Sequence, residues 1–220
     1  MRINFKKIRE RLGNYDNIFM AVSGGLDSMV MLDVIDRCLG FEKSLYCCYF
    51  EHNKERDERG ERDFIRNTLI TKYPKTRMFN SYLDHEKMDP MESMESEMRK
   101  QRYEFLDAVV NKNGLDSSIL LTAHHLDDNI ETVLFNLLTN RKIGGVNENL
   151  FFCTTQVHRP LLDYAKADLM TYAQNFGVTW MEDPTNLDSN YCDRNFIRQQ
   201  LLPSIVRKFG SQSHLLRLLK

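Results

Sequence analysis

Short continuous runs of apolar residues alternate along the chain with longer stretches in which apolar residues recur at helical spacing. The apolar runs predict buried strands, and the longer stretches, which lack Gly and Pro, predict helices. We expect strands at 18–22, 45–50, 78–83, 119–123 and 150–157. We expect helices at 29–35, 61–71, 92–111, 126–140 and 164–176. This alternation predicts an α/β fold with a doubly wound, mostly parallel, five-stranded sheet of the Rossmann-like kind.

The last part of the chain is basic. Residues 194–220 contain no Asp or Glu, and their cations are Arg194, Arg198, Arg207, Lys208, Arg217 and Lys220. Such a segment can neutralise phosphates, and it is equally compatible with a solvated helix face. We therefore expect one domain at 1–200, followed by a short helical basic tail at 201–220 that begins a linker or a shortened C-terminal region.

Composition narrows the class of protein. A chain of 220 residues is long enough for one well-cored α/β domain, and its net charge of −1 does not indicate a nucleic-acid binder. The five cysteines include no Cys-x-x-Cys pair, which argues against a disulfide framework and a zinc ribbon. No apolar run reaches 18 residues and no signal sequence is present, so we expect no membrane span and a cytoplasmic location.

The loop after the first predicted strand has the composition of a phosphate-binding loop. It reads Ser23-Gly24-Gly25-Leu26-Asp27-Ser28. Glycines let backbone amides approach an anion, and a helix N-terminus adds its positive dipole. The Gly-Lys-Ser/Thr ending of a Walker A loop is missing. The loop therefore predicts a site for a pyrophosphate group, against the alternative of an ordinary capped glycine turn.

A second polar cluster follows the predicted strand 119–123. His124 and His125 come directly after it, and Asp127, Asp128 and Glu131 lie at the start of the next helix. Carboxylates three or four residues apart share a helix face. Such a face suits Mg²⁺ beside phosphates, or the ammonium group of a substrate. Both clusters lie at carboxyl ends of strands, where doubly wound sheets bind their ligands.

The loop at 23–28 resembles the SGGxDS signature of the PP-loop ATP-pyrophosphatases. The wider chain resembles one branch of them, the tRNA(Ile)-lysidine synthetases. The segments that carry this resemblance are 23–28, 50–52, 95–103, 122–132 and 159–198. The resemblance implies an adenine nucleotide alpha hydrolase-like fold. It also implies a ligase that adenylates the C2 oxygen of the first anticodon cytidine of an isoleucine tRNA with a CAU anticodon. The amine of free lysine then displaces AMP.

The resemblance, read with the residue chemistry, assigns provisional roles. Catalytic roles go to Asp27, Asp127, Asp128, Arg99 and Arg194. ATP-binding roles go to Ser23, Gly24, Gly25, Leu26, Asp27, Ser28, His52 and His124. Roles in binding the tRNA and lysine are assigned to Asp128, Glu131, Arg102 and Arg198. Asp27 and Asp127 are the expected Mg²⁺ ligands, and which carboxylate acts as a base is left open.

Three departures separate the chain from the family pattern. The family segment Val-Asp-His-Gly-Leu-Arg reads here Phe-Glu-His-Asn-Lys-Glu at 50–55, and the family loop Arg-Gly-Ser-Gly is replaced at 139–145. Family members also continue into C-terminal domains that hold tRNA, whereas this sequence ends at Lys220. Two alternatives therefore stay open. One is another PP-loop reaction on RNA, such as thiolation or amidation, and the other is a non-catalytic nucleotide- or RNA-binding relative. The oligomeric state is also open, with a homodimer among the options.

Overall fold

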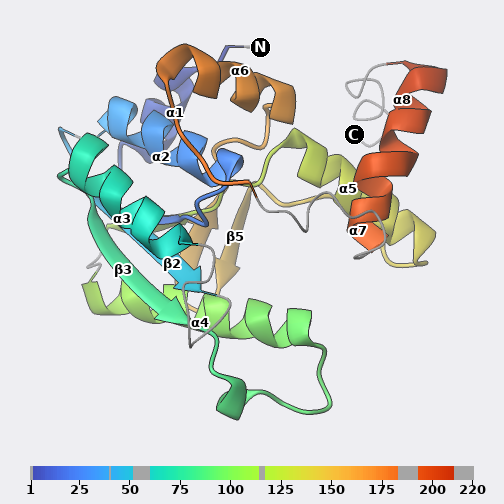
Figure 1. Ribbon diagram of the computed structural model, residues 1–220, viewed down its shortest axis with the longest axis horizontal. Helices are drawn as coiled ribbons and strands as arrows, with labels where there is room; N and C mark the ends of the chain where they lie inside the picture. Colours follow the sequence, from blue (N-terminus) through green and yellow to red (C-terminus); the bar gives the residue numbers. More distant parts are fainter. Residues whose placement is uncertain (1, 40, 52–59, 114–116, 183–192, 211–220) are drawn as a thin grey trace.

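A computed structural model describes residues 2–39, 41–51, 60–113, 117–182 and 193–210. At its centre is a six-stranded sheet with the strand order β3-β2-β1-β4-β6-β5 (Figure 1). The strands are β1 (Asn17–Ala21), β2 (Ser44–Glu51), β3 (Arg77–Tyr82), β4 (Ser118–Leu121), β5 (Asn149–Phe152) and β6 (Thr155–His158). All neighbouring pairs are parallel except β5 and β6. The sequence-based expectation of a doubly wound, mostly parallel sheet is confirmed.

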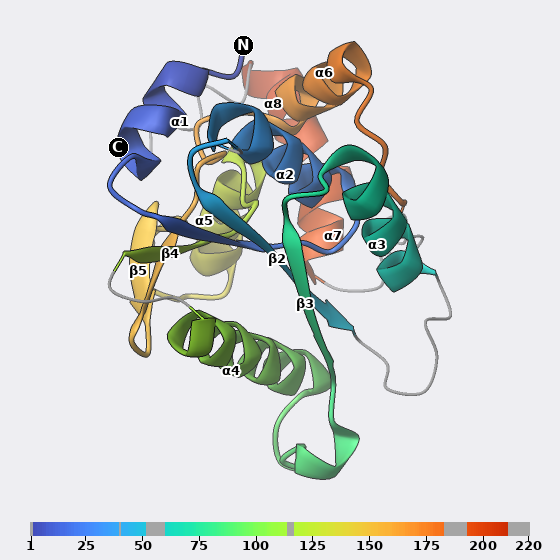
Figure 2. The same ribbon diagram turned by 90° about the vertical axis from the view of Figure 1, so that its left-hand side faces the viewer.

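Helices cover both faces of the sheet. The α-helices are α1 (Phe5–Leu12), α2 (Leu26–Leu39), α3 (Glu61–Lys72), α4 (Met94–Asn113), α5 (Leu126–Leu138), α6 (Lys166–Phe176), α7 (Asp193–Phe196) and α8 (Leu202–Phe209). A 3₁₀ turn, η1 (His85–Lys87), precedes α4, and a π-helical turn, η3 (Ile197–Leu201), joins α7 to α8. Figure 2 shows α4 beneath one face and α1, α2, α3 and α6 above the other. None of the described helices is long and apolar enough to cross a bilayer.

The number of strands differs from the prediction. The single strand expected at 150–157 is a hairpin, because the chain reverses at Cys153 and Thr154 and β5 pairs antiparallel with β6. Cys153 takes a φ of 49°, a value that non-glycine residues adopt rarely. The side chains of Thr154 and Thr155 both donate hydrogen bonds to Asp107 on α4, which fixes the turn against that helix. The sheet therefore has six strands instead of five.

Strand alternation divides the core into two layers. On β1, Ile18 and Met20 point toward the layer formed with α1, α2, α3 and α6, whereas Phe19 packs toward α4. Phe19 stacks on Tyr46 of β2 with ring centroids 4.4 Å apart. Successive side chains of a strand point to opposite faces, so this continuous apolar run buries both faces of β1.

A buried carboxylate ties α2 to its neighbours. Asp33 of α2 is 3% exposed, and it accepts hydrogen bonds from the hydroxyls of Tyr73 and Tyr172 and from Arg37. Tyr73 follows α3 and Tyr172 lies on α6, so one side chain connects three helices. Charge-assisted hydrogen bonds contribute about 1.5–3 kcal/mol each, and they offset the cost of burying Asp33. This network holds the helix that follows the glycine-rich loop.

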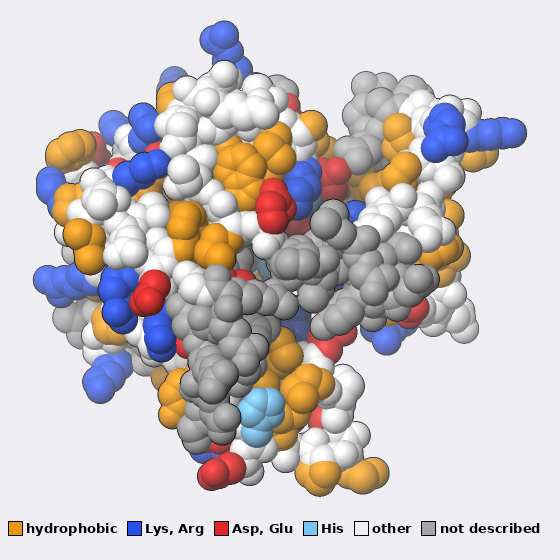
Figure 3. All heavy atoms as spheres, viewed as in Figure 1, with side chains coloured by type: hydrophobic (Ala, Val, Ile, Leu, Met, Phe, Trp, Pro, Cys, Tyr) orange, Lys and Arg blue, Asp and Glu red, His pale blue; other side chains and the backbone are white. Residues whose placement is uncertain are grey.

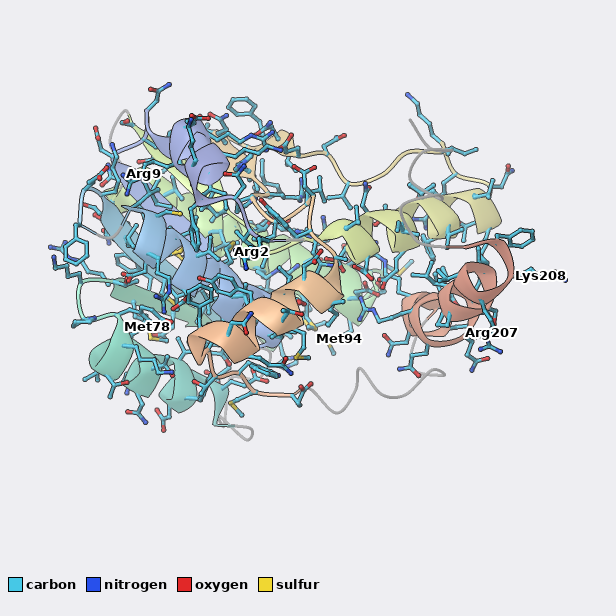
Figure 4. The ribbon with its side chains drawn as sticks, turned by 90° about the horizontal axis from the view of Figure 1, so that it is seen from above. Arg2, Arg9, Met78, Met94, Arg207 and Lys208 are labelled. Carbon is cyan, nitrogen blue, oxygen red and sulfur yellow. The ribbon has the colours of Figure 1, made fainter. Side chains whose placement is uncertain are left out.

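Some expectations concern residues that the structure does not describe. His52 and the loop expected at 183–190 lie outside the described residues, as do Cys192 and residues 211–220. Of the basic tail, the structure describes residues up to 210. Arg207 and Lys208 lie on α8, at the end of the molecule far from Arg9 (Figure 4).

Candidate active site

The two sequence clusters meet at the carboxyl edge of the sheet. β1 and β4 are direct neighbours, with Met20 opposite Leu121, so the loops that follow them are adjacent. The glycine-rich loop leads from β1 into α2, and residues 122–125 lead from β4 into α5. In Figure 1 the first turns of α2 and α5 come together near the centre of the molecule. Parallel pairing thus brings together segments about one hundred residues apart.

Hydrogen bonds within the glycine-rich loop fix its shape. The Ser28 hydroxyl donates to the carbonyl of Gly25 over 2.9 Å and accepts from the backbone amide of Ser23 over 3.1 Å. Gly24 has a φ of +84°, which favours glycine, and its carbonyl accepts a hydrogen bond from the amide of Met181. The loop is therefore anchored both to the start of α2 and to the segment that follows α6.

The His125 side chain lies between three carboxylates. Its Nε2 is 3.5 Å from an oxygen of Asp27 and 3.5 Å from one of Asp128, and its Nδ1 is 3.5 Å from Asp127. The imidazole is only 2% exposed. Burial would lower the pKa of His125, but its contacts with Asp127, Asp27 and Asp128 raise it to about 10. His125 is therefore an imidazolium at neutral pH and acts as a counter-ion for the three aspartates.

Lys166, at the first position of α6, completes this cluster. Its Nζ lies 3.5 Å from Asp27, and its backbone amide donates to Asp127 over 2.8 Å. Burial would raise the pKa of Asp27, but His125 and Lys166 hold it below the usual value. One oxygen of Asp27, Oδ1, is buried without a hydrogen-bond partner among the described residues. The lone pairs of that oxygen are therefore unused, and they suit a metal ion or a hydrogen-bond donor.

Asp128 and Glu131 are held by protein contacts. Asp128 accepts from the backbone amide of His125 over 2.9 Å and so caps α5. Glu131 is 3% exposed and forms a two-pronged ion pair with Arg198 of η3, with distances of 2.7 and 2.8 Å. Bonding to Glu131 raises the pKa of Arg198. In this structure Glu131 and Arg198 thus bind each other and join α5 to the C-terminal helices.

His124 faces a different environment from His125. Its Nδ1 lies 3.0 Å from the hydroxyl of Thr122 and 3.3 Å from Nε of Arg159. Burial lowers the pKa of His124 to about 4, and the charges of Arg159, Arg99 and Arg102 add to this effect even though Asp128 opposes it. His124 is therefore neutral at pH 7.

The three arginines beside His124 form a basic cluster. Arg99 and Arg102 lie over the ring of Tyr103, 5.1 and 5.7 Å from its centroid. Arg159 is only 4% exposed, and burial lowers the pKa of both Arg159 and Arg102. Guanidinium groups with few carboxylate partners are suited to bind phosphate. The basic cluster lies beside the carboxylates at the same edge of the sheet.

The structure brings together most of the predicted site residues, but not all. Asp27, Asp127, Asp128 and the glycine-rich loop share one edge. Arg194 lies apart from them, exposed and 5.8 Å above the ring of Phe135. The sequence analysis gave neither Lys166 nor Arg159 a role of its own. Their nearness to the site depends on the crossover from β6 to α6, which no local motif marks.

The described residues contain no preformed metal site made of protein ligands alone, because no group of three or more His, Cys, Asp or Glu side chains is arranged to hold an ion. Mg²⁺ does not need such a cage, since it is usually bound through one or two carboxylates plus substrate phosphates. Oδ1 of Asp27, which has no hydrogen-bond partner among the described residues, fits that mode of binding. On the face drawn in Figure 3, basic and acidic side chains of the described residues are interspersed.

Comparisons with known proteins agree with this geometry. A family model described as a PP-loop domain matches residues 1–205. The tRNA(Ile)-lysidine synthase of Enterococcus faecalis is 33% identical over 198 residues, which cover 88% of this chain and 41% of that protein. The enzyme of the same name from Methylococcus capsulatus is 32% identical over 219 residues, covering 95% of this chain and 47% of that protein. The chain thus spans less than half the length of these relatives.

Solved structures share the fold. A U34-tRNA thiolase from Methanococcus maripaludis superposes with a TM-score of 0.69 at 16% identity, covering 98% of this chain and 77% of that one. An NH₃-dependent NAD synthetase from Campylobacter jejuni gives a TM-score of 0.57 at 11% identity, covering 98% and 88%. At these identities the likeness concerns the fold alone. Given the match over residues 1–205, together with the loop and its carboxylate partners at one sheet edge, the chain belongs to the PP-loop domain family.

Proposed function

We propose that the chain is the ATP-dependent part of a ligase that modifies tRNA, with the activity of a tRNA(Ile)-lysidine synthetase. In this reaction the C2 oxygen of the first anticodon cytidine attacks the α-phosphate of ATP, and pyrophosphate leaves. The amine of lysine then attacks C2, the C2–oxygen bond breaks and AMP leaves. The relatives at 32–33% identity carry this activity in their names, and the proposal extends it to this chain.

One observation carries the proposal. Asp27, from the glycine-rich loop, and Asp127 and Asp128, from the start of α5, converge on the single side chain of His125. A phosphate-binding loop thus lies directly beside a set of carboxylates. Adenylation depends mainly on positioning and on balancing the charge of the leaving pyrophosphate. The loop amides would position the phosphates, and Mg²⁺ held by the carboxylates would balance their charge.

ATP is the expected first substrate. Amides of the loop at 23–28 and the dipole of α2 would hold the phosphates. Asp27 and Asp127 would hold Mg²⁺, which supplies positive charge to the phosphates when bound. His124, neutral and held between Thr122 and Arg159, would contact the nucleotide through a hydrogen bond and not through charge.

Lysine must reach the site as an ammonium ion and lose a proton before it can attack. The carboxylates around His125 can bind the ammonium and accept that proton. His125 and Lys166 already neutralise part of this negative charge, which keeps Asp27 ionised at neutral pH. The basic cluster of Arg99, Arg102 and Arg159 would bind a phosphate of the RNA beside the target nucleotide.

Thiolation is the competing reaction on this fold, and the cysteines do not favour it. Cys38, Cys47 and Cys48 are buried, and burial raises the pKa of each thiol. Such thiols are inert, because the thiolate is the reactive form. Cys153 is exposed, but it lies at the turn between β5 and β6. No described cysteine therefore stands as a sulfur carrier in the site.

A single reaction tests the proposal. The protein is incubated with ATP, Mg²⁺, lysine and an unmodified isoleucine tRNA with a CAU anticodon, and the digested nucleosides are identified by mass. Lysidine is the expected product. Pyrophosphate release without lysidine, in the presence of another nucleophile or RNA, would point to a different PP-loop reaction. Absence of ATP turnover with any RNA would refute the enzymatic proposal.

A further inference from the structure

Two arginines from separate segments of the chain lie over one aromatic ring of α5. The guanidinium carbon of Arg141 is 5.0 Å from the centre of the Phe135 ring, and that of Arg194 is 5.8 Å from it. Both arginines are exposed, and neither forms an ion pair with a carboxylate in the part of the chain that the structure describes. Two cations held at one ring repel each other, and a bound anion would relieve that repulsion.

The end of α5 turns Arg141 back onto the helix. Asn140 has a φ of 54°, the left-handed conformation that ends many helices, and the amide of Arg141 donates to the carbonyl of Asn136 over 2.9 Å. In a helix end of this kind, the residue at the position of Arg141 packs against the last turn, which here presents Phe135. The following loop is tied down as well, because the Asn136 side chain donates to the carbonyl of Gly144 over 2.8 Å. The position of Arg141 is therefore fixed by the backbone.

Arg194 reaches the same ring from α7. It precedes Arg198 by four residues, so the two side chains share one helix face. Arg198 binds Glu131 of α5, and Phe135 follows Glu131 by four residues. The two helical segments, which lie side by side in Figure 1, therefore contact each other at two successive levels. One level is the ion pair at Glu131, and the other is the cation–π contact at Phe135.

This pair of arginines lies at a defined distance from the active site. Asp128, Glu131 and Phe135 are spaced three and four residues apart, so they share one face of α5. At about 1.5 Å per residue, Phe135 lies about 10 Å along the helix from Asp128. A stacked nucleic-acid strand advances about 3.4 Å per nucleotide, so this distance corresponds to about three nucleotides.

The arrangement of charges favours a polynucleotide as the ligand. Basic groups lie on two sets of elements next to the carboxylates: the cluster of Arg99, Arg102 and Arg159 beside His124, and the arginines at the far end of α5. A strand that carries one negative charge per nucleotide can contact both sets while one of its nucleotides occupies the site. Guanidinium groups bind phosphate through paired N–H donors, and they also stack on aromatic rings.

We propose that Arg141 and Arg194 bind backbone phosphates of the RNA about three nucleotides from the reacting one, with Phe135 fixing the orientation of both guanidinium groups. This inference rests on the proposed function, in which RNA is the substrate. It gives Arg194 a role in binding RNA, in place of the catalytic role expected from the sequence. Phosphate contacts position a nucleic acid without reading its bases, so the contribution of both arginines does not depend on the loop sequence.

The test measures binding of the full chain to a fluorescent anticodon stem-loop of an isoleucine tRNA with a CAU anticodon, by anisotropy and without ATP. Arg141→Gln and Arg194→Gln should each weaken binding about fivefold, as expected for an exposed ion pair. Each should also make the dependence of log affinity on log salt concentration shallower by about 0.7–1. Arg66→Gln on α3, on the opposite side of the molecule in Figure 1, is the charge-matched control and should change neither quantity.

Further variants separate a phosphate contact from a structural role. Arg141→Lys keeps the charge, so it should keep the salt dependence and lose only part of the affinity. Phe135→Leu keeps both cations, so it should lower the affinity with the salt dependence unchanged. A stem-loop with altered anticodon bases should lose affinity by the same factor in Arg141→Gln and Arg194→Gln.

The outcomes distinguish this inference from the proposed function. Equal binding by the unaltered protein, Arg141→Gln and Arg194→Gln would overturn the inference, and so would an equal loss in Arg66→Gln. Lysidine formation is measured separately. Binding that depends on both arginines, without any lysidine, would refute the proposed reaction and leave the RNA contact standing. Lysidine formation with binding that is independent of both arginines would do the reverse.

Discussion

At the scale of single residues, Asp27 connects the two halves of the site. Its side chain comes from the glycine-rich loop, yet its partners are His125 from the β4–α5 loop and Lys166 from α6. The Oδ1 atom is buried and has no partner among the described residues. One oxygen of this carboxylate contacts the cations His125 and Lys166, and the other is unused and suits a bound cation.

We expect Asp27→Ala to abolish ATP-dependent pyrophosphate release, because it removes both the proposed Mg²⁺ ligand and the partner of His125. A loss of at least 100-fold is the order of magnitude for a group that stabilises charge in the transition state. Pyrophosphate release is measured with tRNA and lysine present. Asp63→Ala, on the exposed side of α3, is the control and should keep normal activity. Near-normal release by the Asp27 variant would remove this residue from the site.

Two buried histidines make the fold sensitive to acid. The pKa values of His124 and His158 are lowered to about 4 from 6.5. Since the unfolded chain binds these protons at higher pH than the folded chain, their stability contribution is complete above pH 6.5 and is lost as the pH falls toward 4. Each histidine should cost about 3 kcal/mol between pH 7.5 and pH 4. Denaturant unfolding at several pH values should show a smaller acid loss for His158→Leu. His85→Leu should match the unaltered protein, and equal losses in all three would contradict the pKa values.

The sequence singled out the three aspartates that the structure brings together around His125, but it did not reveal the difference between the two histidines beside them. The order of residues at 122–132 identifies the cluster, and neighbours in sequence look equivalent there. In the folded chain one ring turns toward three carboxylates, and the other turns toward Thr122 and Arg159. Their pKa values therefore move in opposite directions, to about 10 and about 4. Such a difference depends on partners that lie far away in the chain.

At the scale of elements, one ion pair holds the C-terminal helices to the domain. Arg198 of η3 binds Glu131 of α5 through two nitrogens and also lies 3.6 Å from Asp128. Figure 1 shows α7 and α8 beside α5, apart from the sheet. The π-helical turn between α7 and α8 carries Arg198, whose side chain reaches Glu131 on α5.

We expect Arg198→Ala to loosen η3 and α8, because it leaves Glu131 buried without its partner. The cost should be about 2–3 kcal/mol, at the low end for a buried pair since 32% of the Arg198 side chain is exposed. Faster hydrogen exchange in residues 197–209 is the readout, and Arg207→Ala on the neighbouring α8 is the control. Adding Glu131→Gln to Arg198→Ala should recover part of the loss. Unchanged exchange would show that the apolar contacts of Ile197 and Leu202 suffice.

The sequence predicts elements well where periodicity is strong and poorly where tertiary contacts decide. Four of the strands lie within one or two residues of their expected bounds, and three of these, β1, β2 and β4, carry a continuous apolar run. The β5–β6 turn carries no Gly, Asn or Pro, so the pattern does not reveal it, and its stability comes from Asp107 of α4. Helix α1 was not expected, since only Ile8 and Leu12 mark its buried face and a side-chain cap from Asn4 starts it.

At the scale of the whole molecule, nucleotide binding should be visible as added stability. A ligand that binds only the folded chain stabilises it by about 2.7 kcal/mol at 100 times its Kd. For a domain of this size that corresponds to a rise in Tm of roughly 5–10 °C. We expect this rise with ATP and Mg²⁺ together in a thermal melt, and a much smaller one with Mg²⁺ alone, because the described residues form no metal cage of their own. An equal rise with the metal alone would contradict the role given to Asp27.

The pairing of β1 with β4 also determines when the protein becomes competent during its synthesis. Asp27 leaves the ribosome 100 residues ahead of Asp127, and Lys166 follows later still. Until β4 has inserted beside β1, the loop has neither His125 nor the carboxylates of α5 next to it. Closing a chain segment of that length is a late and slow event in folding. On the proposed function, a nascent chain would display a complete glycine-rich loop and still be unable to consume ATP until its sheet is fully assembled.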